Sequence, residues 1–329
     1  MNRTDAIYVA GSQTVIGAAI GRELEKRGYT CIVGRQGGEP ELTDSSQVDA
    51  FFAETRPDYV FLAAGKSGGI MANRRYPTEI MRNNLLVSCY VLESALRYRV
   101  KKLLYFASSC SYPKACPQPM RVESLLTGPL EPTNEAYAIA KLAGMKLCQA
   151  YREQYQVNFI AAIPADVFGP GDDFDLDSSH VVAALIHKMH EGKIGSAESV
   201  EIWGSGNPRR EFIYADDLAS AALHVMCEYH DSAPINLGGG FDLSIKEIAM
   251  VIKEIVGYPG DLRFDTSKPD GMPMKHLDST ALTQIGWRPT VSLRSALSAT
   301  YEWYLNSGQF GEGVLQEPTS ASGKSIFTG

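Results

Sequence analysis

Residues 6–17 read Ala-Ile-Tyr-Val-Ala-Gly-Ser-Gln-Thr-Val-Ile-Gly, and the fold follows from this stretch. It opens with a short apolar run rich in β-forming side chains, which predicts a buried strand. A glycine turn comes next, and the amphipathic segment 18–27 then predicts a helix that Gly28 would end. Strand, glycine turn and helix in this order are typical of a dinucleotide site, because the first helical amides can face a pyrophosphate. The residues expected to contact the cofactor in this turn are Gly11, Gln13, Thr14, Val15 and Ile16.

The second predicted strand, residues 29–33, ends just before Arg35. Enzymes that use NAD usually present Asp or Glu here to the ribose hydroxyls, whereas an arginine suits the 2′-phosphate of NADP. We therefore predict NADP(H) as the cofactor, with Arg35 reading the phosphate. The alternative is that Arg35 is an ordinary solvated loop charge.

Strands and helices alternate through the first half of the chain. Residues 59–64, 102–108 and 158–164 have the pattern of strands, and residues 77–98 and 135–155 have the pattern of helices. Such alternation predicts an α/β fold with a doubly wound parallel sheet, the Rossmann arrangement, in which ligands bind at the carboxyl ends of the strands. Further cofactor contacts are expected at these ends, from Ala63, Ala64, Pro164, Ala165 and Val167.

The chain of 329 residues is long for one domain, which suggests a large fold with a smaller lobe. We expect residues 1–170 to form the NADP-binding domain, with residues 211–240 returning to it. Residues 171–210 and 241–307 would form a C-terminal substrate-binding lobe. Residues 308–329, rich in Gly, Ser, Thr and Pro, are expected to be a mobile tail.

The composition excludes several classes of protein. Hydrophobic residues make up 44% and charged residues 21% of the chain, which is ordinary for a globular protein. A net charge of −7 without a basic stripe argues against a nucleic-acid partner. No apolar run approaches the roughly 18 residues of a membrane span, so no membrane partner is expected. The six cysteines lack metal or disulfide spacing, which predicts no metal site and a cytoplasmic location.

A candidate catalytic group lies near the end of the predicted strand 102–108. Tyr137 and Lys141 are four residues apart and share one helix face, so the ammonium group could lower the pKa of the phenol towards working pH. The hydroxyl of Ser108 could hold the same substrate oxygen, and Cys110 adds a softer acid/base group. The alternatives are a half-buried helix tyrosine and a small buried cysteine.

Four segments in order resemble the GDP-L-fucose synthase family of extended short-chain dehydrogenases. They are residues 106–114 (Phe-Ala-Ser-Ser-Cys-Ser-Tyr-Pro-Lys), residues 130–141, the Trp-Gly-Ser-Gly and Arg-Glu-Phe motifs within residues 203–212, and residues 266–271. The resemblance covers roughly residues 6–305. It implies a double epimerisation of GDP-4-keto-6-deoxy-mannose at C3 and C5, followed by hydride transfer from NADPH to C4.

The resemblance also implies a role for each residue. Cys110 would be the base and His180 the acid of the epimerisation. Ser108 would hold the C4 oxygen, Tyr137 would protonate it, and Lys141 would tune Tyr137 and bind the ribose. His180 would lie beside the cofactor as well. The expected contacts to the substrate are Ser109, Lys188, Trp203, Arg210 and Asp270. A homodimer is implied too, built through the helices 77–98 and 135–155.

The sequence departs from the family pattern around the cofactor and the sugar. Residues 12–14 are Ser-Gln-Thr where His-Arg-Gly is usual, and residues 166–168 are Asp-Val-Phe where Asn-Leu-Tyr is usual. The segment 175–177 is also atypical, and Lys188 and Met274 stand where arginines are usual. Loss of an arginine removes a bidentate contact to phosphate. These changes fit a relative that acts on a different 4-keto sugar nucleotide.

Three alternatives therefore remain open. The protein could act on another GDP-linked keto sugar, such as a dideoxyhexose or a deoxyheptose, or perform only epimerisation or only reduction. It could be a 4-epimerase or dehydratase of nucleotide sugars, although those usually carry Tyr-Gly where this chain has Tyr112 and Pro113. It could be a non-catalytic NADP-binding regulator, against which the intact Ser108, Tyr137 and Lys141 argue.

Overall fold

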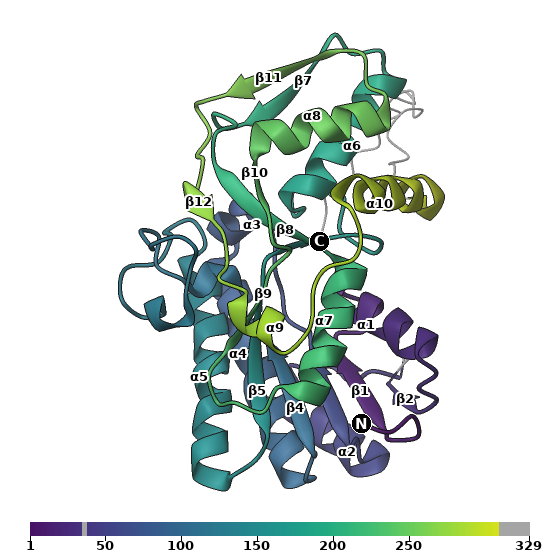
Figure 1. The fold of residues 1–329 in the computed structure, drawn as a ribbon, viewed down its shortest axis with the longest axis vertical. Coiled ribbons are helices and arrows are strands. Elements are labelled where there is room, and N and C mark those ends of the chain that lie inside the picture. Colours follow the sequence, from purple (N-terminus) through teal and green to yellow (C-terminus); the bar gives the residue numbers. More distant parts are fainter. Residues whose placement is uncertain (35–37, 309–329) are drawn as a thin grey trace, which may run out of the picture.

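A computed structural model describes residues 1–34 and 38–308 of the chain (Figure 1). Two sequence-based expectations fall on the other residues. Arg35, the expected reader of the 2′-phosphate, and the tail 309–329 lie outside the described residues. Among the helices of the described segments, none is both long and apolar enough to cross a membrane.

A six-stranded parallel sheet forms the larger half of the molecule, in the order β2-β1-β3-β4-β5-β9. The predicted doubly wound α/β fold is confirmed. The residues of β1, β4 and β5 are all buried, which requires cover on both faces of the sheet. The strands are β1 (Ile7–Ala10), β2 (Ile32–Val33), β3 (Tyr59–Leu62), β4 (Lys102–Phe106), β5 (Phe159–Pro164) and β9 (Ile235–Leu237).

Two groups of helices supply that cover. In one group α1 packs on α7, and in the other α4 packs between α2 and α5. Each helix turns an apolar stripe to the strands and a polar face to solvent, as helices on a parallel sheet must. The helices are α1 (Val15–Lys26), α2 (Ser45–Thr55), α4 (Pro77–Arg97), α5 (Glu135–Tyr155) and α7 (Ala215–Glu228).

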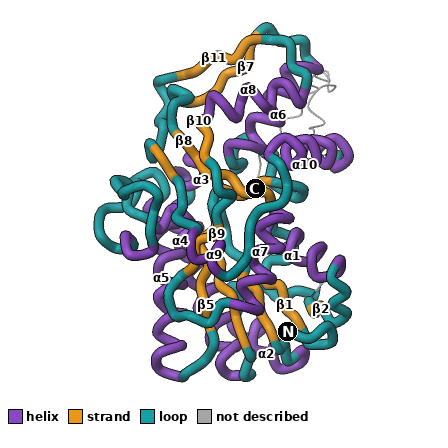
Figure 2. Tube along the Cα trace, in the orientation of Figure 1, coloured by secondary structure: helices purple, strands orange, loops and turns teal. Residues whose placement is uncertain are grey.

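A smaller lobe lies above the carboxyl ends of the large sheet in Figure 1 and has its own apolar core. Figure 2 shows its strands as a group separate from those of the large sheet. Strand β8 is central, because it pairs with β6, β10 and β12, while β7 pairs with β11. The strands are β6 (Asp166–Phe168), β7 (Ser199–Trp203), β8 (Arg209–Tyr214), β10 (Asp242–Ser244), β11 (Asp261–Asp265) and β12 (Met274–Lys275). The helices are α6 (Val181–Ile194), α8 (Ile245–Val256) and α10 (Leu293–Ser307).

Short helices complete the connections. They are α3 (Ile70–Arg75), η1 (Ser109–Ser111), η2 (Val122–Ser124) and α9 (Thr280–Gln284). Because η1 follows β4 directly, it carries the candidate catalytic serine segment out of the sheet and towards the smaller lobe.

Several local predictions differ from the structure for identifiable reasons. The second strand spans only residues 32–33 rather than 29–33. Helix α8 begins only at Ile245, because residues 242–244 pair antiparallel with β8 and the Ser244 side chain caps the helix through a reciprocal bond with Glu247. Residues 211–214, expected to return to the large sheet, belong to β8 in the smaller lobe, whereas α7 and β9 pack on or join the large sheet.

Candidate active site

The glycine turn after β1 lies tightly against the end of β3. Gly11 has a φ of +86°, and a Cβ there would lie 2.7 Å from the Ala64 backbone. A Cβ at Gly17 would lie 2.0 Å from the Gly11 oxygen. Thr14, where a glycine is usual, caps α1: its Oγ1 accepts from the Gly17 amide at 3.0 Å and donates to the Gly11 oxygen at 2.8 Å. The turn is therefore compact enough to bring a dinucleotide close to its backbone and to the end of β3.

An acidic residue that the sequence analysis passed over lies on this turn. The carboxylate of Glu39 accepts hydrogen bonds from the Gly11 amide at 2.5 Å, the Tyr8 hydroxyl at 3.0 Å and the Ser12 hydroxyl at 3.3 Å. Burial, followed by the charge of Glu39, raises the pKa of Tyr8 and keeps its phenol a donor. The signal in the sequence was an acid shortly after the second strand, where ribose-binding acids occur.

The other predicted cofactor contacts surround the turn. Val15 and Ile16 are half-buried in the first turn of α1, and Gln13 is exposed. The remaining contacts lie at or after the ends of β3 and β5, with the last of them in β6, and these are Ala63, Ala64, Pro164, Ala165 and Val167. The Ala165 amide donates to the Leu237 oxygen at 3.0 Å, so the end of β5 is tied to β9.

Lys141 lies between the ends of β3 and β4 and is 6% exposed. Its Nζ donates to the Phe106 oxygen at 3.1 Å and to the Ala64 oxygen at 3.4 Å. Burial without a charged partner lowers the pKa of this ammonium group to about 8. The lysine is thus fixed by two strand-end carbonyls on the side of the site where the glycine turn lies.

Tyr137 and Ser108 meet, but the expected effect of Lys141 on Tyr137 is wrong. Burial, and next the charge of Cys110, raises the pKa of Tyr137, and only the hydrogen bond with the Ser108 hydroxyl acts to lower it. Lys141 does not offset burial because its ammonium group is directed at backbone carbonyls. A phenol that stays protonated is suited to donate a proton rather than to remove one.

Cys110 has two polar neighbours that the sequence analysis did not name. Its half-buried Sγ accepts from Asn134 Nδ2 at 3.2 Å and from Lys275 Nζ at 3.3 Å. Asn134 precedes α5, and Lys275 comes from β12 in the smaller lobe. Asn134 lies within residues 130–141, one of the four segments that resemble the family. No pattern in the sequence around Lys275 indicated that this side chain would reach the thiol.

A cluster of charged side chains, buried or half-buried, adjoins this thiol. The carboxylate of Asp166 lies 3.6 Å from Lys275 Nζ and 3.9 Å from Arg210 Nε, and it accepts from the Ser109 hydroxyl at 3.4 Å. Burial acts to raise the pKa of Asp166, but the charges of Lys275 and Arg210 together hold it below its usual value. Of the predicted substrate contacts, Ser109 and Arg210 are therefore placed beside the candidate catalytic groups.

His180 is the residue before the first turn of α6; its side chain makes no capping hydrogen bond, and the residue is exposed to solvent. Removal from water by the atoms around it lowers its pKa, against the opposing charge of Asp166. The imidazole is therefore mostly neutral near pH 7. Its segment is held by the Gly69 amide, which donates to the Ser178 oxygen at 2.9 Å.

The remaining predicted substrate contacts gather at the outer end of the smaller lobe. Lys188 and Lys268 place Nζ atoms 5.3 and 5.5 Å from the ring centre of Trp203, which is 41% exposed. The Asp270 carboxylate accepts from the Ser205 amide at 2.7 Å and the Ser205 hydroxyl at 2.8 Å. Asp270 thus holds the turn beside Trp203, and the exposed ring with two cations offers a surface for an aromatic or anionic group.

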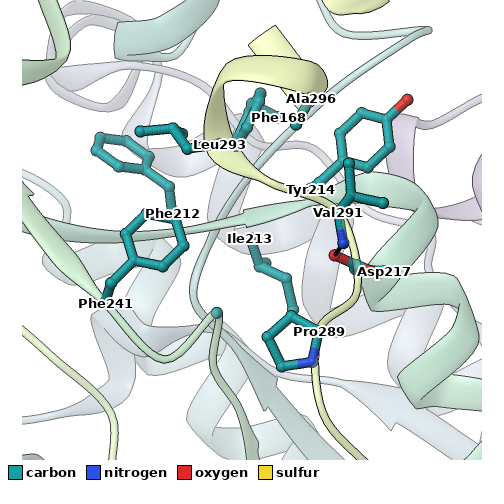
Figure 3. Close-up of a pocket in the computed structure, with 11 residues that line it drawn as sticks. Phe168, Phe212, Ile213, Tyr214, Asp217, Phe241, Pro289, Val291, Leu293 and Ala296 are labelled. Atoms are coloured by element: carbon teal, nitrogen blue, oxygen red, sulfur yellow. Dashed lines mark hydrogen bonds between the residues drawn. The ribbon is translucent and has the colours of Figure 1, made fainter.

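A pocket shown in Figure 3 lies elsewhere, between β8 and the segment that leads into α10. Its lining is mostly apolar and includes Phe168, Phe212 and Leu293. Its carboxylate, Asp217, accepts hydrogen bonds from Thr290 and Val291. None of the predicted catalytic residues lines it, so we assign it to packing within the lobe.

Comparison with known proteins identifies the family. The profile of the NAD dependent epimerase/dehydratase family matches residues 7–238. The putative GDP-L-fucose synthase 2 of Arabidopsis thaliana is 48% identical over 307 residues, which are 93% of this chain and 94% of that protein. The chain belongs to the GDP-L-fucose synthase family. The resemblance stated from the sequence motifs is confirmed.

Solved structures place this family member among GDP-sugar enzymes. A GDP-6-OMe-4-keto-L-xylo-heptose reductase from Campylobacter jejuni has a TM-score of 0.89 and 32% identity, covering 94% of this chain and 99% of the other. A GDP-mannoheptose C4 reductase from the same organism, solved with NADP bound, has a TM-score of 0.84 and 34% identity, covering 93% and 99%. The chain is thus similar in structure to enzymes whose names give GDP-linked heptoses as their substrates.

Proposed function

We propose that this protein is an NADPH-dependent epimerase and reductase that converts GDP-4-keto-6-deoxy-mannose into GDP-L-fucose. As a member of its family it is an NADP(H)-dependent oxidoreductase with epimerase activity. One observation carries the proposal: Ser108, Tyr137 and Lys141 meet Cys110 at the carboxyl ends of the central strands, beside the glycine turn. A ketone-reducing group and a thiol base are thereby within reach of one sugar.

The epimerisation uses the acidity of carbons next to the C4 ketone. Cys110 removes the proton from C3 or C5, and the electrons move onto the C4 oxygen, which the Ser108 and Tyr137 hydroxyls hold. His180 returns a proton to the opposite face of the carbon, which inverts it. The position of His180 at the start of α6, within electrostatic reach of Asp166, supports this pairing of base and acid.

The reduction uses the groups on α5. NADPH supplies a hydride to C4 when it is bound. Tyr137 donates its proton to the C4 oxygen, and its raised pKa supports this role because the phenol stays protonated until then. Lys141 positions the ribose, and its two carbonyl contacts hold its ammonium group in place.

The cofactor would lie along the turn formed by Gly11 and Thr14, and Lys141 would hold its ribose. The close contact between Gly11 and Ala64 supports this fit, because a side chain at Gly11 would displace the end of β3. Arg35 reads the 2′-phosphate in this proposal. NADPH should then bind more tightly than NADH, and Arg35→Ala should narrow the difference; equal affinities in the parent protein would contradict the role of Arg35.

A second candidate substrate is another GDP-linked keto sugar, such as a dideoxyhexose or a deoxyheptose. Three residues favour it, because Asp166, Lys188 and Met274 differ from the usual family residues in the region of the sugar and its phosphates. Lys188 contributes a point charge beside Trp203 rather than a bidentate fork. The guanine base and pyrophosphate would be recognised at this Trp203 surface in both cases.

The decisive experiment offers the protein a panel of GDP-linked 4-keto sugars with NADPH in deuterated water. Deuterium at ring carbons reports epimerisation, and loss of NADPH absorbance reports reduction. We expect both with GDP-4-keto-6-deoxy-mannose. Cys110→Ser should stop deuterium incorporation and still allow slow reduction, because Ser108, Tyr137 and Lys141 remain. Full exchange in that variant would contradict the role of Cys110, and turnover of a heptose alone would favour the second candidate.

We place this enzyme in the cytoplasm as a homodimer. The cysteines in the described segments are all free thiols, which fits a reducing compartment. Helices α4 and α5 pack side by side, and Ile139 and Tyr155 of α5 are 39% and 49% exposed, which supports pairing of these helices across a twofold axis. Light scattering should give twice the mass of the chain, and a monomer at every concentration would contradict the assembly.

A further inference from the structure

We propose that Lys275 is a positioning residue that holds Cys110 as its thiolate, and that Asp166 moderates this effect by sharing the same ammonium group. The proposal rests on the proposed function in one respect only, which is that the thiolate acts as the base of the epimerisation. The ionisation itself is a property of the free protein. It can be measured without substrate or cofactor.

The position of the ammonium group is fixed by the fold. Lys275 is 8% exposed, and its Nζ lies 3.3 Å from Cys110 Sγ. Strand β12 is only two residues long, but it pairs with β8 so that Lys275 lies opposite Arg210. The backbone on both sides is also tied, because the Arg209 amide donates to the Pro273 oxygen at 2.9 Å and the Met120 amide donates to the His276 oxygen at 2.7 Å. A lysine held in this way loses little further freedom when the thiol ionises.

Lys275 is the cation in direct contact with the thiol. Arg210, on β8, also lies within electrostatic reach of the thiol, but its Nε is directed at Asp166 and one of its terminal nitrogens donates to the Arg209 oxygen at 2.8 Å. The other neighbours, Asn134 before α5 and Tyr137 on α5, carry no positive charge. An ammonium group in a hydrogen bond with sulfur favours the charged form of a thiol, and the thiolate is the basic form.

Asp166 limits this effect. Its Oδ1 lies 3.6 Å from the same Nζ, so Lys275 divides its charge between a carboxylate and the sulfur. An asparagine, the usual family residue here, would leave the whole ammonium charge to the thiol. The carboxylate in this chain therefore leaves the thiol only part of the ammonium charge.

The test measures how fast Cys110 reacts with iodoacetamide as a function of pH. The full-length protein is used without substrate, and peptide mass spectrometry separates Cys110 from the other five cysteines. The variants are Lys275→Met, which keeps the length of the side chain, Lys275→Arg, which keeps the charge, and Asp166→Asn. The matched control is Lys246→Met, at an exposed position of the same lobe.

Lys275→Met should lower the alkylation rate at pH 7 about tenfold or more and move the midpoint of the pH profile upward, since an adjacent charge shifts ionisation by one unit or more. Lys275→Arg should restore most of the rate, and Asp166→Asn should raise it severalfold. Lys246→Met should match the parent. An unchanged pH profile in a folded Lys275→Met, as judged by circular dichroism and NADPH binding, would overturn the proposal.

Failure of this proposal can be told apart from failure of the proposed function. If the alkylation profile shifts as expected but no GDP-linked keto sugar exchanges deuterium, Lys275 controls the thiol and the substrate is wrong. If the parent exchanges deuterium, Cys110→Ser does not, and the alkylation profile is unshifted in Lys275→Met, then Cys110 is the base and Lys275 does not set its ionisation. The second result overturns the role of Lys275 alone.

Discussion

Lys141 and Lys275 are both buried beside the candidate catalytic groups, with exposures of 6% and 8%, yet their surroundings act on them in opposite directions. Burial is the largest influence on each and favours the neutral amine. The partners of the Lys141 ammonium group are backbone carbonyls without a full charge, so the effect of burial prevails and the pKa of Lys141 falls to about 8. Around Lys275 the charges of Asp166 and Cys110 outweigh burial, and the pKa rises above its usual value.

The difference shows how one site divides its two tasks. The α5 side, with Lys141 and Tyr137, carries a lysine near its titration point and a phenol kept protonated, which suits delivery of a proton during reduction. The β12 side, with Lys275 and Cys110, carries a lysine kept charged next to a thiol, which suits removal of a proton during epimerisation. Changes on one side should therefore leave the other task largely intact.

The largest effect is expected from Tyr137→Phe. This change removes the proton donor of the reduction, so NADPH oxidation should fall by about 100-fold or more. NADPH binding, followed by fluorescence, should change little, because Lys141 and the glycine turn are untouched. Deuterium exchange should fall by much less, because Ser108 still holds the C4 oxygen. Equal loss of exchange and reduction would show that the two sides of the site are not separate.

The second prediction uses pH. Lys141 is charged below a pKa of about 8 and neutral above it. In the proposed mechanism the charged form holds the ribose of NADPH, so the rate of reduction is highest at lower pH and declines as the pH rises through about 8. The rate of NADPH oxidation should fall roughly tenfold between pH 7 and pH 9. Lys141→Arg keeps the charge at all these pH values and should abolish the decline. A parent rate that stays constant over this range would remove the charge of Lys141 from the reduction.

The smallest effect is expected from His180→Asn. The pKa of His180 lies below its ordinary value, so the charged acid is a minor form near pH 7 and its share grows as the pH falls. Deuterium exchange in the variant should be severalfold slower than in the parent, and the difference should widen from pH 8 to pH 6. His230→Asn, at an exposed position, serves as the control. A difference that narrows at low pH would exclude His180⁺ as the acid.

Local pattern was enough to predict the α5 side of the site. Tyr137 and Lys141 lie four residues apart in a helix, and that spacing alone puts them on one face. The glycine turn could be predicted because Gly11 and Gly17 satisfy a steric demand that few other residues meet. What the pattern did not predict was the sign of the shift at Tyr137, because burial depends on everything that packs around the phenol.

The sequence by itself thus determined the parallel sheet, the cofactor turn and the reducing group, since each depends on neighbours within a few residues or on strand–helix alternation. Only the tertiary structure decided that Lys275 touches Cys110, 165 residues away, and that Asp166 shares its charge. Strand β12 has two residues, too few to show any periodicity, and its place depends on pairing with β8. Electrostatic control of the thiol is therefore a product of long-range strand pairing, which no local spacing encodes.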